Sequence, residues 1–192
     1  MKLIPLIRVI LAMTGMVSLT HCAITPDVPD LAKIRLEKDR LHSFDGDEFP
    51  YRTWLSREEP EIVIIGVHGI SGAASDYKPL GDHLLSKFPR TAVYAAETRG
   101  QGNDPIKERR GHIDDKKEWF HDLVAFTHLI RQRHPKAKIV WCGESMGSLI
   151  VLHTYAQATN KEVLCDAMIL ASPIVNIRGD LPKWKEYLAN IL

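Results

Sequence analysis

Residues 138–150 read KIVWCGESMGSLI, an apolar run that leads directly into the pattern Gly-x-Ser-x-Gly and then into a helical pattern. A sharp turn between a strand and a helix needs glycine where neighbouring backbone comes close. Gly143 and Gly147 supply that freedom on either side of Ser145. In such a turn the serine hydroxyl is exposed at the end of the strand and can act as a nucleophile. The sequence therefore predicts that Ser145 lies on a nucleophile elbow. The alternative is a Gly/Ser turn of the kind found in any α/β protein.

A second part of the same chemistry follows another apolar run, Ile62–Val67, where the chain continues with His68 and Gly69. Acyl transfer needs N–H donors that hold the oxygen on which negative charge develops. The predicted donors are the backbone N–H of Met146, directly after the serine, and that of Ile70 in the loop after this run. The alternative for His68-Gly69 is an ordinary turn at the end of a strand.

The rest of the chain alternates strand and helix patterns, which predicts an α/β fold with a mostly parallel sheet and helices on both faces. A hairpin is expected around Asp45-Gly46, between 41–44 and 49–55. Further strands are expected at 62–67, 91–96, 138–142 and 167–172. Helices are expected at 77–88, from a cap at Asp114 to His134, after the elbow, and at 180–192. In the first of these helices, the residues expected to face the sheet are Leu80, Leu84, Leu85 and Phe88.

The N-terminus differs in kind from the rest of the chain. Lys2 and Arg8 precede an uncharged stretch over 9–19 that is too short to span a membrane and is typical of a secretory signal. Leu19-Thr20-His21-Cys22 resembles the lipobox of bacterial lipoproteins, although His21 stands where a small residue is usual. Residues 1–22 are therefore predicted to be a signal peptide or lipoprotein signal, with Cys22 as the lipidated residue. The alternative is an uncleaved apolar anchor.

This segment predicts an exported protein that is periplasmic, secreted or held at the membrane as a lipoprotein, with residues 23–40 as a tether. Membrane association would run through the signal or the lipid. A net charge of +1 favours no nucleic-acid partner. Three cysteines form no disulfide framework, and no His, Cys, Asp or Glu spacing predicts a metal. No cofactor is expected, and the oligomeric state is left open.

Five stretches together resemble the α/β-hydrolase superfamily, in particular its monoacylglycerol lipase and lysophospholipase branch, also described as serine aminopeptidase-like hydrolases. The resemblance implies a serine hydrolase that cleaves carboxylic esters of single-chain lipids. Glu97, Asp104 and Ser148 depart from the residues common in that branch. The matching stretches are Val67-His68-Gly69, Arg99-Gly100-Gln101-Gly102, Gly111-His112, Gly143-Glu144-Ser145-Met146-Gly147 and Leu170-Ala171-Ser172-Pro173.

In this fold the acid and the histidine of the triad follow the serine in the chain. The only histidine after Ser145 is His153, about two helical turns along the expected helix and out of reach of the hydroxyl. Asp166 precedes its strand, Asp180 lies at the start of the expected cap, and His112 is a weak substitute for the base. Residues 41–173 are therefore expected to form an incomplete hydrolase core and 174–192 the start of a cap.

A serine without a base is a weak nucleophile, so the 192-residue chain is expected to be nearly inactive. The strand at 167–172 is expected to leave an open sheet edge that favours aggregation. Two other functions stay open. One is an aminopeptidase-like hydrolase of the same family, and the other is a non-catalytic half-fold that binds a lipid or a partner.

Overall fold

A seven-stranded sheet forms the centre of the computed structural model, which describes residues 31–158 and 164–173. The predicted signal segment with Cys22, the expected cap over 174–192 and the helix expected at 180–192 lie outside the described residues. Along the sheet the strand order is β1-β2-β3-β5-β4-β6-β7. The strands are β1 Arg35–Leu36, β2 Arg40–His42, β3 Glu48–Trp54, β4 Ile62–Val67, β5 Thr91–Ala96, β6 Lys138–Glu144 and β7 Ala167–Ala171.

The sheet is mixed, with β5, β4, β6 and β7 parallel and β1, β2, β3 and β5 antiparallel. The central strand β4 is buried along five of its six residues, as a continuous apolar run between two parallel neighbours requires. The predicted hairpin forms between β2 and β3. The α/β fold predicted from the alternation of strands and helices is therefore confirmed.

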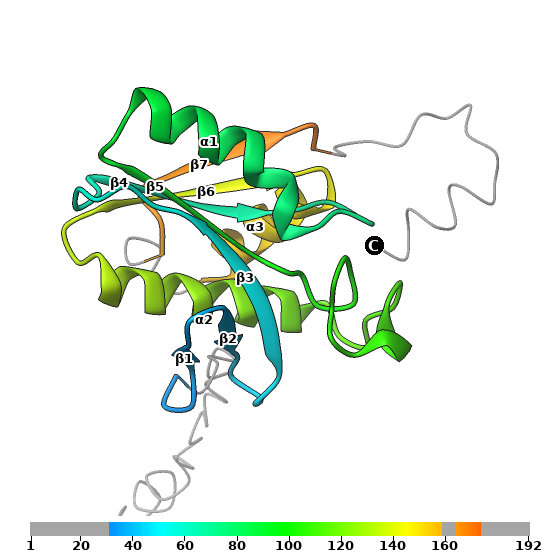
Figure 1. The fold of residues 1–192 in the computed structure, drawn as a ribbon. Helices are drawn as coiled ribbons and strands as arrows, with labels where there is room; N and C mark the ends of the chain where they lie inside the picture. The colour runs from blue at the N-terminus through cyan, green and yellow to red at the C-terminus, as the bar shows by residue number, and fades with distance from the viewer. Residues whose placement is uncertain (1–30, 159–163, 174–192) are drawn as a thin grey trace, which may run out of the picture.

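Helices cover both faces of this sheet (Figure 1). On one face, α1 (Lys78–Lys87) follows the 3₁₀ turn η1 (Ala74–Tyr77) and packs on Ile64 and Val93. On the other face lie α2 (Lys117–Arg133) and α3 (Met146–Gln157), with Trp119, Phe126 and Ile150 in the larger core cluster. A second 3₁₀ turn, η2, spans Lys107–Arg109 in the loop after β5.

Three local expectations differ from the structure. Phe88 is 56% exposed rather than facing the sheet, because it is the C-cap residue where the chain leaves the helical conformation. The helix expected from a cap at Asp114 begins at Lys117, whose N–H donates to Asp115 Oδ1 at 2.9 Å. The sheet begins at Arg35, inside the range expected to be a tether, since β1 pairs with β2.

The topology brings two strand ends together at the centre of the sheet. β5 lies on one side of β4 and β6 on the other, with Val67 opposite Gly143 in register. The connection after β4 runs to β5 on one side, and the connection after β5 runs back past β4 to β6 on the other. Such a reversal of strand order opens a crevice at the carboxyl ends of the strands, where ligands bind in open α/β sheets. In the part of the chain that the structure describes, no helix is both long and apolar enough to span a bilayer.

Candidate active site

Ser145 lies between the end of β6 and the start of α3, with φ of 50° and ψ of −113°. A non-glycine residue at positive φ is strained, and such strain persists where the surrounding structure holds it. Here the Ser145 N–H donates to Ala171 O at 2.8 Å and its carbonyl accepts the Ser148 N–H at 3.0 Å. The side chain is half-buried. The predicted elbow is therefore present, and its serine is not sealed in the core.

Both glycines of the motif are required because neighbouring backbone leaves no room for a side chain. A Cβ on Gly143 would lie 2.5 Å from Gly147 O, and a Cβ on Gly147 would lie 2.0 Å from Val67 O. Real Cβ atoms do not approach backbone oxygens so closely. The absence of both side chains lets the start of α3 lie directly against the end of β4.

The loop after β4 lies beside the serine. A Cβ on Gly69 would be 3.2 Å from Ser145 Cβ and 3.8 Å from Ser145 Oγ. The backbone of this loop therefore approaches the hydroxyl closely enough to hold a group that reacts there. His68 and Gly69 lie in the loop as the sequence analysis placed them, directly after the strand.

His68 orients the next peptide group. Its ring is fully buried, and Nε2 accepts the Thr98 N–H at 3.0 Å, so the ring proton of the neutral form is on Nδ1. Nδ1 lies 2.9 Å from Gly69 O, which also accepts the Gly72 N–H at 3.1 Å. Because a trans peptide is planar, fixing the Gly69 carbonyl also fixes the opposite direction of the Ile70 N–H.

Met146 is the first residue of α3, so its N–H is one of the helix's N-terminal donors without an intrahelical acceptor. Among residues 31–158 and 164–173, neither the Met146 N–H nor the Ile70 N–H has an acceptor. Free N–H donors next to the serine and in the adjoining loop are what an oxyanion site requires. Their role stays a prediction.

Tyr77 ties the two strand ends together. Its buried hydroxyl lies 3.0 Å from Val67 O and 2.6 Å from Cys142 O, at the ends of β4 and β6. Burial and the neighbouring Cys142 raise the pKa of this phenol above its usual range, so it remains a hydrogen-bond donor. This role of Tyr77 was not predictable from the sequence, because nothing local distinguishes a tyrosine that bridges two strands from any other tyrosine at a helix start.

No hydrogen bond joins a described histidine to Ser145. His112 is 70% exposed and pairs with Asp114 at 3.1 Å, and His153 stacks on Phe120 with ring centroids 6.0 Å apart. Asp166 lies at the amino end of the sheet, where it accepts the Ile139 N–H at 2.8 Å. Within the described residues, no three His, Cys, Asp or Glu side chains gather as metal ligands.

The three departures from the family pattern each anchor the backbone. Glu97 accepts the Ala74 and Asn103 N–H groups at 3.3 and 3.1 Å. Asp104, fully buried, pairs with Arg109 at 2.6 Å. The Ser148 hydroxyl donates to Gly143 O at 2.7 Å and lies 3.0 Å from Ala171 O. These residues stabilise the loops around the site and do not contact Ser145 through their side chains.

A cavity of about 40 Å³ lies between the sheet and α2, lined by residues that include Phe49, Trp119 and Ile150. It has room for a few water molecules at most. Ser145 does not line it. Phe49, Trp119 and Ile150, which line this cavity, belong to the larger core cluster.

A mostly parallel sheet in which β6, next to the central strand, ends in a serine elbow defines the chain as an α/β-hydrolase of the serine type. The chain belongs to the serine aminopeptidase S33 family, whose family model matches residues 58–192. No curated protein matches the chain.

Solved structures with the same fold include two lipases and one esterase. At identities of 19 and 20% these likenesses show the fold alone, and the chain spans about half the length of the structures that it matches. A monoglyceride lipase from Saccharomyces cerevisiae, solved with a substrate analog, has a TM-score of 0.60 at 19% identity over 85% of this chain and 51% of that one. A monoacylglycerol lipase from Paleococcus ferrophilus has a TM-score of 0.53 at 20% identity over 75% and 50%. A carboxyl esterase from Bacillus coagulans has a TM-score of 0.52 at 19% identity over 68% and 42%.

Proposed function

We propose that this chain carries the nucleophile and oxyanion-binding half of a serine hydrolase whose substrates are carboxylic esters of single-chain lipids, such as monoacylglycerols or lysophospholipids. The observation that supports this most is the conformation of Ser145, held at positive φ at the end of β6 with the backbone of Gly69 close to its side chain. The neighbouring folds with lipase and esterase activity support the ester class.

In this proposal the Ser145 oxygen attacks the acyl carbon of the ester. The carbonyl oxygen takes up negative charge and accepts hydrogen bonds from the Ile70 and Met146 N–H groups. Each such donor contributes roughly 3–4 kcal/mol to transition-state stabilisation. The alcohol then leaves with a proton, and the acyl group remains on Ser145 until water releases it. Removal of the proton from the Ser145 hydroxyl and its transfer to the leaving alcohol both require a base. The described residues do not bring one to the hydroxyl.

A fluorophosphonate probe tests the nucleophile directly. It forms a covalent bond with an activated serine oxygen, and we expect labelling of the 192-residue chain that is lost in Ser145→Ala. Ser148→Ala is the matched control, because Ser148 is buried and bonded to the Gly143 carbonyl. Equal labelling of wild type and Ser145→Ala would contradict the proposal.

The same measurement tests a finer point. We propose that the 192-residue chain is labelled slowly, because losing the base of a triad costs several orders of magnitude in rate. Labelling as fast as that of a complete serine hydrolase would contradict the expected inactivity while leaving Ser145 as the nucleophile. If Ser145 is never labelled but lipid binding survives Ser145→Ala, the chain is a binding half-fold.

The family to which the chain belongs favours a second candidate, a hydrolase that removes N-terminal residues from peptides. The same serine and N–H donors serve amide hydrolysis, so the elbow does not separate the two. A panel of p-nitrophenyl esters and aminoacyl anilides, tested on the protein that contains this chain, distinguishes them. Preference for short-to-medium acyl esters supports the ester proposal, and preference for anilides overturns it.

Export is proposed from the sequence of the N-terminus. The apolar stretch over 9–19 and the lipobox-like Leu19-Thr20-His21-Cys22 support a lipoprotein signal, with Cys22 as the lipid attachment site. Metabolic labelling with palmitate in a bacterial host, comparing wild type with Cys22→Ser, tests this. Label on wild type alone supports lipidation. Secretion without label supports a cleaved signal peptide instead.

A further inference from the structure

We propose that Gln101 is a positioning residue for the oxyanion site. Its side chain accepts the Ser71 N–H at 3.1 Å from a loop 30 residues further along the chain. This inference rests on the proposed function, because it concerns the placement of the turn that carries the Ile70 N–H. It assigns that placement to two clamps: His68 holds the Gly69–Ile70 peptide, which contains this N–H, and Gln101 holds the next peptide, Ile70–Ser71.

The turn that carries Ile70 has two possible peptide orientations. It is closed by the Gly72 N–H donating to Gly69 O at 3.1 Å, with Ile70 and Ser71 as its central residues. Ser71 has φ of 57°, the positive value that a type II turn requires at its third position and that glycine or asparagine normally supplies. Serine is strained there, so an interaction outside the turn must favour this orientation.

Gln101 supplies that interaction. A backbone N–H can only donate, so the Gln101 atom that faces Ser71 is the amide oxygen. Flipping the Ile70–Ser71 peptide would turn this N–H away and leave the Gln101 oxygen without its partner. Since Gln101 is only 6% exposed, water cannot easily replace the lost bond.

The support behind Gln101 is rigid. Its own N–H donates to Thr98 O at 2.9 Å, and its carbonyl accepts the Asp104 N–H at 2.9 Å. The neighbouring Arg99 carbonyl accepts the Trp119 indole N–H at 2.8 Å, which fixes the loop to α2. The Gln101 side chain therefore holds the Ser71 peptide from a fixed base.

Taken together, the loop after β5 holds both peptides that flank Ile70. Thr98 selects the His68 tautomer that contacts Gly69 O, and Gln101 fixes the Ser71 N–H. Without Gln101 the Ile70–Ser71 peptide would be free to flip, and the turn would be held from outside only by His68 at Gly69 O, so the Ile70 backbone would be placed less firmly. The reaction step would slow, while binding of the rest of a substrate would be unchanged.

Saturation kinetics with the fluorophosphonate probe on the 192-residue chain test this inference. Gln101→Met removes the acceptor at similar length, and we expect the maximal labelling rate to fall roughly threefold to tenfold, the effect of one neutral hydrogen bond. The probe concentration at half-maximal rate should not change. Gln101→Glu keeps an accepting oxygen and should restore most of the rate. Gln132→Met, on the exposed face of α2, is the matched control.

Hydrogen exchange in the same samples gives a readout that does not depend on catalysis. The Ser71 amide should exchange roughly threefold to tenfold faster in Gln101→Met, while amides of β4 and β6 remain protected. Loss of protection in β4 and β6 would show unfolding, and Gln101→Ala, which is smaller, then replaces Gln101→Met in both measurements.

Three results would overturn the inference. Unchanged Ser71 exchange excludes the clamp. Normal labelling with faster Ser71 exchange excludes its role in the reaction, with the hydrolase proposal intact. No labelling of wild type, with exchange that still depends on Gln101, overturns the hydrolase proposal and with it any role of Gln101 in the reaction.

Discussion

Gly147 is the second residue of α3, and its Cα faces the end of β4. A Cβ there would lie 2.0 Å from Val67 O and 2.8 Å from His68 O, both of them backbone atoms that cannot rotate away. The Gly-x-Ser-x-Gly pattern indicated that position 147 requires glycine. The physical reason is that the helix start, the strand end and the oxyanion loop meet at one point.

Gly147→Ala should therefore destabilise the protein by about 3 kcal/mol, the upper end of the usual cost of overpacking, because backbone must move. Urea denaturation measures the loss. Gly111→Ala is the control, since a Cβ on Gly111 meets no atom within 4 Å and only its φ of +86° is unfavourable. That strain alone costs about 1 kcal/mol. A loss for Gly147→Ala no larger than that for Gly111→Ala would mean that contact with the end of β4 does not make Gly147 necessary.

At the scale of elements, the loop after β5 is joined to the loop after β4 through Glu97. This carboxylate is 5% exposed and accepts N–H bonds from Ala74 and Asn103. Burial raises the pKa of Glu97, but the Asn103 N–H and side-chain amide both donate to this carboxylate and outweigh burial, so the pKa lies below its ordinary 4.5. Its contribution to stability is therefore fully present above about pH 4.5 and is lost as the pH falls through the folded-state pKa.

Glu97→Gln should lower the free energy of unfolding by about 1–2 kcal/mol at pH 7, the value of charge-assisted hydrogen bonds to a buried carboxylate. The deficit should shrink on acidification, because wild type loses its charged form and the variant has none to lose. Urea denaturation at pH 7 and near pH 3 measures both values. Glu61→Gln, at an exposed carboxylate paired with Arg90, should give no pH-dependent deficit. A constant deficit for Glu97→Gln would mean that the carboxyl does not titrate as described.

The inner strands β4 and β5 were predictable because each is a local apolar run, and the hairpin was predictable from Asp45-Gly46 between two strand patterns, whereas β1 was expected to be part of a tether. The supports of the site were not predictable, because they join residues far apart in the chain. Glu97 was noted only as a departure from a family pattern, and Gln101 was quoted as a motif residue without a role. Phe88 was misplaced because apolar spacing does not reveal where a helix ends.

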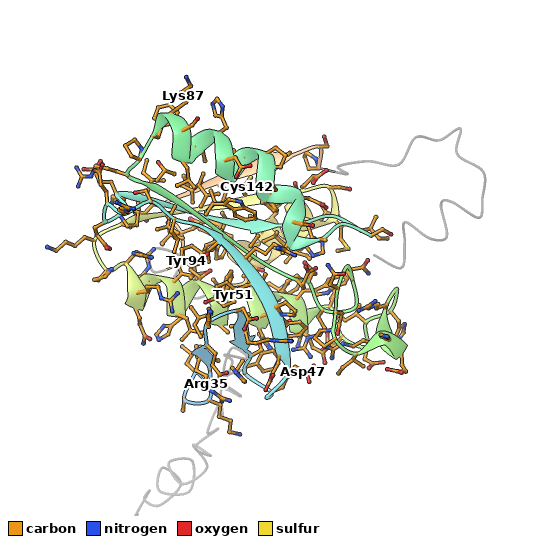
Figure 2. The ribbon with its side chains drawn as sticks, in the orientation of Figure 1. Arg35, Asp47, Tyr51, Lys87, Tyr94 and Cys142 are labelled. Atoms are coloured by element: carbon orange, nitrogen blue, oxygen red, sulfur yellow. The ribbon has the colours of Figure 1, made fainter. Side chains whose placement is uncertain are left out.

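Arg99 joins three elements in the same way. Its buried guanidinium makes a bidentate pair with Asp122 on α2, both bonds 2.9 Å long. It also contacts Asp47 at 2.7 Å, in the turn between β2 and β3, which lies beside the loop after β5 (Figure 2). A planar fork with five donors makes these contacts at once, and a lysine ammonium does not.

Arg99→Lys should therefore cost roughly 2 kcal/mol, since it keeps the charge and loses the paired geometry inside a buried cluster. Arg35→Lys is the matched control, because Arg35 is exposed and, among the residues that the structure describes, pairs with Glu37 alone. Its effect should stay within about 0.5 kcal/mol. Thermal or urea unfolding measures both variants. Equally small losses of stability in Arg99→Lys and Arg35→Lys would show that the planar, paired geometry of the Arg99 guanidinium is not needed.

For the molecule as a whole, the two edges of the sheet differ. One edge is β1, which has two residues, and short edge strands pair poorly with other chains. The other is β7, which in the described part of the chain pairs with β6 only and carries the apolar residues Met168, Ile169 and Leu170. Ile169 is 48% exposed. A strand of this kind favours pairing with another copy.

The 192-residue chain should therefore self-associate as its concentration rises, and Ile169→Lys should weaken that association by placing a charge on the edge strand. Sedimentation velocity over a concentration series measures it. Ile62→Lys is the matched control. Ile62 is similarly exposed, at 41%, but begins the central strand β4, which already has neighbours on both sides. If wild type stays monomeric, the β7 edge does not drive association. If Ile169→Lys and Ile62→Lys weaken association equally, exposed apolar area governs it and the β7 edge does not.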